Sequence, residues 1–96
     1  MIDWGLLLGL FYEKAQSDCR LSPAHVSLYF ALIHEAGHTL AIPFYLRRSA
    51  LMSKAKIYSS VTMNRCLRAL HEYGYIDYRP SHSPGESRVM ILMLSS

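Results

Sequence analysis

The chain has few cysteines and no long apolar run, and these two absences exclude several classes of protein. Its 96 residues include only Cys19 and Cys66, too few for a disulfide framework, so we expect two free thiols and a cytoplasmic location. No apolar run approaches the roughly 20 residues that span a bilayer, so no membrane association is expected. The short apolar stretch 6–11 follows Asp3 instead of a basic segment, which is unlike a signal peptide.

Acidic residues are missing from the middle of the chain. The net charge is only +3, but residues 36–71 contain no Asp or Glu. The basic residues in this interval are Arg47, Arg48, Lys54, Lys56, Arg65 and Arg68. A cluster of one sign on one structural unit is typical of a phosphate-binding face, although an ordinary solvated surface is the alternative.

A helix is predicted from Ser59 to Tyr73, with its polar and apolar residues on opposite faces. Ser59 is a suitable N-cap residue, and Gly74 stands where a helix end needs a positive φ angle. The residues expected to be buried are Met63, Cys66, Leu67 and Leu70. The opposite face is expected to carry Ser60, Val61, Asn64, Arg65 and Arg68. Arginine can grip guanine or phosphate and asparagine can pair with adenine, so this face is suited to a DNA groove.

The segments around this helix predict a helix-turn-helix followed by a β-hairpin wing. The predicted elements are a strand at 40–43, a helix at 44–54, a turn at 55–58, a strand at 75–79, a turn at 80–86 and a strand at 87–93. Ile57 in the first turn is expected to enter the core, with Leu46, Ala50 and Leu51. Pro43 is expected to end the strand that precedes the first helix.

Two further helices are predicted before this unit. Residues 4–16 form the first, and Ser22 and Pro23 open the second, which Gly37 is expected to end. The apolar face of the first helix comprises Trp4, Leu7, Leu8, Phe11, Tyr12 and Ala15. The core stripe of the second comprises Val26, Tyr29, Phe30 and Ile33. Leu6 and Leu10 widen the first face, which is typical either of a homodimer contact or of an ordinary core helix.

The whole pattern predicts one domain over 1–96, with an N-terminal helical part at 1–20 and a core at 22–93. Half of the residues are hydrophobic, which is enough for a folded core in a chain of this length. The expected fold class is α+β, mainly helical with a small β-hairpin.

The motif Ser-x-x-Thr-apolar-x-Arg-x-Leu-x-x-Leu-x-x-x-Gly-apolar-Ile resembles winged-helix transcription regulators and replication-initiation proteins. It is carried by Ser59, Thr62, Met63, Arg65, Leu67, Leu70, Gly74 and Ile76. More closely, residues 18–92 resemble small bacterial winged helix-turn-helix proteins, MarR-like or replication-initiator-like, of the kind found near mobile genetic elements. The resemblance implies a winged helix-turn-helix with an extra N-terminal helix that binds double-stranded DNA.

Residues 34–38, His-Glu-Ala-Gly-His, match the zinc-hydrolase pattern H-E-x-x-H. On one helix, His34 and His38 would share a face and bind Zn²⁺, while Glu35 activated a water. Against this, a catalytic zinc needs a third protein ligand, and Gly37 is suited to a helix end that would take His38 off the shared face. We therefore predict no enzyme activity, cofactor or metal, and keep a zinc-dependent hydrolase as a minor alternative.

The expected function is sequence-specific binding of double-stranded DNA, as a transcriptional regulator or a mobile-element or replication accessory factor. The predicted helix 59–73 would enter the major groove, and the wing would reach the adjacent minor groove or phosphates. The expected contact residues are Lys54, Lys56, Tyr58, Ser59, Ser60, Val61, Asn64, Arg65, Arg68, His82, Ser83 and Arg88. The alternative is a winged-helix module that binds protein instead of DNA.

Overall fold

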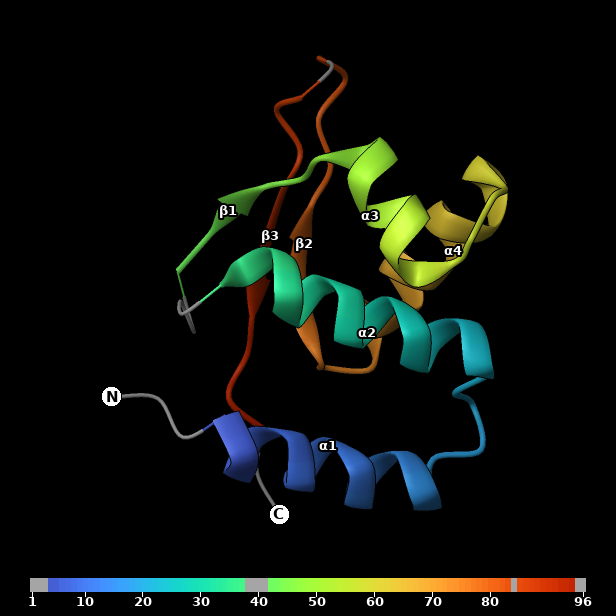
Figure 1. Cartoon of the computed structure of the whole chain (residues 1–96), viewed down its shortest axis with the longest axis vertical. Coiled ribbons are helices and arrows are strands. Elements are labelled where there is room, and N and C mark those ends of the chain that lie inside the picture. The colour runs from blue at the N-terminus through green and yellow to red at the C-terminus, as the bar shows by residue number, and fades with distance from the viewer. Residues whose placement is uncertain (1–3, 38–41, 84, 95–96) are drawn as a thin grey trace.

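A computed structural model describes residues 4–37, 42–83 and 85–94, and it has an α+β fold as the sequence predicts (Figure 1). The described elements are α1 (Trp4–Ser17), α2 (Pro23–Ala36), β1 (Phe44–Tyr45), α3 (Arg48–Ala55), α4 (Ser60–Glu72), β2 (Ile76–Arg79) and β3 (Arg88–Ile91). In Figure 1, α2 lies between α1 below and α3 above, and the hairpin of β2 and β3 reaches past α3. None of the described helices is long and apolar enough to cross a membrane.

The three strands form one antiparallel sheet with the order β1-β3-β2. Tyr78 pairs with Val89 between β2 and β3, and Phe44 pairs with Val89 between β1 and β3. Alternate residues point inward, so the buried side chains of the hairpin are Ile76, Tyr78, Val89 and Ile91. The predicted hairpin is therefore confirmed, with shorter strands than the predicted ranges.

The segment before α3 differs from the prediction. A strand was expected at 40–43 and a helix from Phe44, but the strand is Phe44–Tyr45, and α3 begins only at Arg48. Residues 40 and 41 lie outside the described part of the chain. Pro43 precedes the strand and does not end it. Phe44 is extended because it pairs with Val89, and the N–H of Leu46 donates to the Ser87 carbonyl at 2.8 Å. Pairing with β3 thus prevails over the helical pattern.

The start of α2 is fixed by the predicted N-cap. The Ser22 hydroxyl accepts the His25 N–H, and His25 Nδ1 accepts the Ser22 N–H at 3.0 Å, so His25 completes a capping box. Burial raises the cost of charging this imidazole and lowers the pKa of His25. The neutral form that the capping box requires is therefore favoured.

The predicted core stripe of α2 is partly wrong. Tyr29 is buried, but Phe30 is 44% exposed, while Leu28 and Leu32 are fully buried. The buried face is rotated because α2 packs on α3, α4 and the sheet as well as on α1. A helix with neighbours on several sides buries more than one stripe, and the spacing of its apolar residues then does not show which side is exposed.

The helix α1 is attached to the rest of the domain by an aromatic cluster. Phe11 stacks on Tyr29 with ring centroids 3.9 Å apart and meets Tyr75 edge-on at 5.5 Å. Leu7 is buried beside them, but Tyr12, expected on the packed face, is 63% exposed. After α1, the Asp18 carboxylate accepts the Tyr75 hydroxyl at 3.0 Å and thereby fixes the connection to α2.

Candidate functional site

The turn between α3 and α4 is a tight helix end with an unusual residue. Lys56 has a φ of 59° and adopts the left-handed conformation, in which glycine is the usual residue. The N–H of Ile57 donates to the Met52 carbonyl at 3.0 Å, and the Ile57 side chain is buried. The predicted role of Ile57 is confirmed. Its burial anchors the turn, so the exposed Lys56 is held at a defined place between the helices.

The next helix, α4, begins and ends as the sequence predicts. Ser59 caps it by accepting the Thr62 N–H at 3.3 Å, and Gly74 follows its last turn with a φ of 87°. The buried side chains are the predicted Met63, Cys66, Leu67 and Leu70. Burial also raises the pKa of the Cys66 thiol, and both cysteines are free. One face of α4 is thus fully committed to the core, and the other is available to a ligand.

The exposed face of α4 lines a shallow concavity of about 520 Å³. The residues around it are Val61, Asn64, Arg65, Arg68, Ala69, Glu72 and Tyr73. Neither Arg65 nor Arg68 forms an ion pair with any described residue. The Oδ1 atom of Asn64 is buried and has no hydrogen-bond partner among the described residues. The concavity therefore brings together two guanidiniums that form no ion pair with a described residue, with the Glu72 carboxylate at its edge. Guanidiniums suit phosphate groups and guanine edges.

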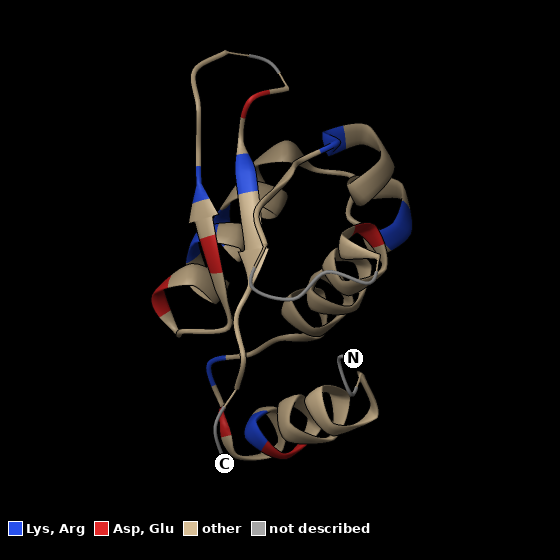
Figure 2. Cartoon of the chain, turned by 90° about the vertical axis from the view of Figure 1, so that its left-hand side faces the viewer, with Lys and Arg blue, Asp and Glu red and all other residues tan. Residues whose placement is uncertain are grey.

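Lys54, unlike Arg65 and Arg68, forms an ion pair with an acidic residue of α2. The Glu35 carboxylate accepts Lys54 Nζ at 3.2 Å and the Arg47 guanidinium at 2.9 Å, and Lys54 also lies 3.0 Å from His34 Nδ1. Figure 2 shows the acidic segment of α2 beside a basic segment of α3. Burial alone would raise the pKa of the Glu35 carboxyl, but hydrogen bonds from Arg47 and Lys54 lower it overall. One carboxylate thus pairs with two members of the basic cluster and offsets one of their two positive charges.

The ion pairs of Glu35 involve the acidic residue of the His-Glu-Ala-Gly-His motif. Helix α2 ends at Ala36, and Gly37 has a φ of 66°, so the helical spacing that a zinc pair needs stops before position 38. His38 itself lies outside the described residues. Glu35 contacts two cations instead of an open site, and within the described residues no three His, Cys, Asp or Glu side chains are grouped as metal ligands.

The hairpin carries additional cations outside the α4 concavity. Arg88 of β3 lies directly opposite Arg79 of β2, and Arg79 is also held by Asp77 at 3.3 Å. His82 and Ser83, at the hairpin tip, line a second concavity of about 500 Å³ against Arg47 and Arg48. Arg79 and Arg48 were not among the predicted contacts. The alternation of β2 and β3 could have indicated Arg79, because it places Arg79 and Arg88 on the same outward face.

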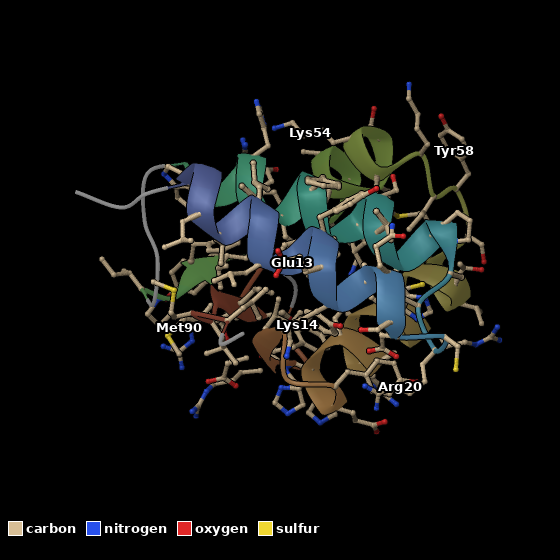
Figure 3. The ribbon with its side chains drawn as sticks, turned by 90° about the horizontal axis from the view of Figure 1, so that it is seen from below. Glu13, Lys14, Arg20, Lys54, Tyr58 and Met90 are labelled. Atoms are coloured by element: carbon tan, nitrogen blue, oxygen red, sulfur yellow. The ribbon has the colours of Figure 1, made fainter. Side chains whose placement is uncertain are left out.

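The remaining predicted contacts lie at the exposed start of α4. Tyr58 is 77% exposed, and Ser59, Ser60 and Val61 are also exposed. Lys54 and Tyr58 project along one edge of the molecule, away from Arg20 and Met90 (Figure 3). The predicted contacts thus fall into separate groups. Residues of α4 surround one concavity, and His82 and Ser83 line another. Arg88 lies apart from both on the sheet, and Lys54 pairs with Glu35.

Comparison with known proteins gave no relative: no protein family, curated protein or solved structure matches this chain.

Proposed function

We propose that this chain is a winged helix-turn-helix that binds double-stranded DNA, with α4 as the recognition helix. The order α2, β1, α3, α4, β2, β3 and the sheet order β1-β3-β2 are those expected of a winged helix, preceded here by α1. In this arrangement α4 enters the major groove and the β2–β3 hairpin lies beside it as the wing.

The observation that carries the proposal is the exposed face of α4. Acidic residues balance several other cations, since Asp18 pairs with Arg20, Glu35 with Arg47 and Lys54, and Asp77 with Arg79. Arg65 and Arg68 form no such pair within the described chain, and they line the same concavity as Asn64. Phosphates would neutralise guanidiniums on an exposed helix face, and guanine O6 and N7 would accept their hydrogen bonds.

Fluorescence anisotropy with a pool of labelled duplexes, at about 50 and 200 mM salt, tests the proposal. Binding should weaken by orders of magnitude across this range, because each phosphate contact releases counterions. Arg65→Ala and Arg68→Ala should each weaken binding by about tenfold. Arg65→Ala should also relax selectivity at one base pair if Arg65 reads guanine.

Lys14→Ala is the matched control, because it removes one positive charge from α1 and leaves α4 unchanged. It should alter the affinity by less than about twofold, since Lys14 is not among the residues that line the concavity of Arg65 and Arg68. Circular dichroism would verify that each variant is folded. No binding by the wild-type chain at low salt would contradict the proposal and favour the protein-interaction alternative.

A further inference from the structure

Val61 is an exposed apolar side chain at the start of the proposed recognition helix, on the same face as Arg65 and Arg68. It lies in the first turn of α4, is 66% exposed, and lines the same concavity as Asn64, Arg65 and Arg68. The hydrogen bond from the Thr62 N–H to the Ser59 hydroxyl fixes the start of the helix, so the position of Val61 is defined by the backbone. The domain core makes little use of this isopropyl group, whereas a ligand in the concavity would meet it.

In the major groove, the apolar feature of the base edges is the C5-methyl group of thymine. Residues near the start of a recognition helix are those that reach base edges most directly. We propose that Val61 reads a thymine methyl group, so that the DNA site of this chain contains a required T·A pair. This inference rests on the proposed function and adds a specificity-determining residue to it.

The spacing of α4 places this pair relative to the base that Arg65 contacts. Val61 and Arg65 are four residues apart, which corresponds to about 6 Å along a helix that rises about 1.5 Å per residue. Base pairs are stacked about 3.4 Å apart, so 6 Å is about two base-pair steps. The thymine should therefore lie within about two or three base pairs of the base pair at which Arg65→Ala loses selectivity.

Replacement of thymine by deoxyuridine tests the inference, because uracil lacks only the C5-methyl group and keeps every hydrogen-bonding atom. Duplexes selected by the wild-type chain from a random-sequence pool are the probe, and each thymine is replaced in turn. The wild-type chain should lose about fourfold in affinity at one position, the effect of one buried methyl group. Val61→Ala should bind the thymine and uracil duplexes equally.

The controls distinguish failure of this inference from failure of the proposed DNA binding. Val61→Ala should remain folded, because the side chain is exposed and alanine favours helix. Met93→Ala, at an exposed apolar residue after β3, should keep the full preference for thymine. The inference would be overturned if the wild-type chain bound every uracil duplex as tightly as the thymine duplex. It would also be overturned if Val61→Ala still bound a uracil duplex more weakly than the thymine duplex. Either result would leave DNA binding intact. Failure to enrich any duplex would overturn both.

Discussion

At the scale of single residues, the Glu35 carboxylate pairs with Arg47, which precedes α3, and with Lys54 of α3, and only 8% of its side chain is exposed. Arg47 and Lys54 follow Glu35 by 12 and 19 positions in the chain, so their separation along the sequence gives no sign of these ion pairs. Counting charges along the sequence therefore overstated the free positive charge of the central segment. Glu35 instead fixes both ends of α3 to the end of α2.

We predict that Glu35→Gln lowers the free energy of unfolding by about 1–2 kcal/mol at pH 7, because it removes two charge-assisted hydrogen bonds from a mostly buried group. The folded state lowers the pKa of Glu35, so this stabilisation is present above the unfolded-state pKa of about 4.3 and is lost as the pH falls further. Urea denaturation from pH 7 to pH 3 should show the two chains converging in stability.

Glu13→Gln is the matched control, since Glu13 is exposed on α1 and faces outward in Figure 3. It should change the stability by less than about 0.5 kcal/mol at any pH in this range. An equal loss in both variants would show that net charge, and not the contact with Arg47 and Lys54, is responsible.

At the scale of elements, the turn before α4 depends on a backbone conformation that costs energy. A left-handed conformation costs an L-residue other than glycine, asparagine or aspartate about 1 kcal/mol, and Lys56 occupies one. A lysine at this position places a cation between α3 and α4. The backbone conformation at Lys56 lowers the stability of the fold, whereas its charge is available to a ligand.

Lys56→Gly should therefore separate stability from binding. We expect the variant to be more stable by up to about 1 kcal/mol, because glycine adopts a positive φ without steric cost. Its affinity for DNA should fall severalfold, and the slope of log affinity against log salt should decrease by about 1, the loss of one phosphate contact. Thermal denaturation and salt-dependent anisotropy measure the two effects. Unchanged DNA binding would remove Lys56 from the interface.

The elements that were predicted well are those fixed by local signals. The Ser59 cap, the apolar stripe from Met63 to Leu70 and the positive φ of Gly74 all depend on residues within α4 or next to it. The errors occur where distant contacts decide. Phe44 is extended because it pairs with β3. Phe30 is exposed because the elements that pack on α2 cover its other sides, which the spacing of its apolar residues does not show. The exposed face of α4 could be predicted, whereas the capture of Lys54 by Glu35 could not.

At the scale of the whole molecule, α1 contributes to the core through a few side chains. Phe11 is buried against Tyr29 and Tyr75, and the connection to α2 is fixed where Asp18 accepts the Tyr75 hydroxyl. Burial, and then the hydrogen bond to Asp18, raise the pKa of Tyr75 to about 12, so its hydroxyl remains a donor at physiological pH. Tyr12 points outward beside this attachment, and a homodimer through α1 stays a prediction.

We predict that Phe11→Ala lowers the free energy of unfolding by about 3–5 kcal/mol, the usual effect of removing a buried aromatic ring, whereas Tyr12→Ala changes it by less than about 0.5 kcal/mol. Trp4, the single tryptophan, lies in α1 and packs against the core, so its fluorescence follows α1, while circular dichroism follows all the helices. If α1 belongs to one cooperative unit, the two signals should change at the same urea concentration. An earlier transition of the Trp4 signal would instead mean that α1 detaches while the remaining helices and the sheet stay folded.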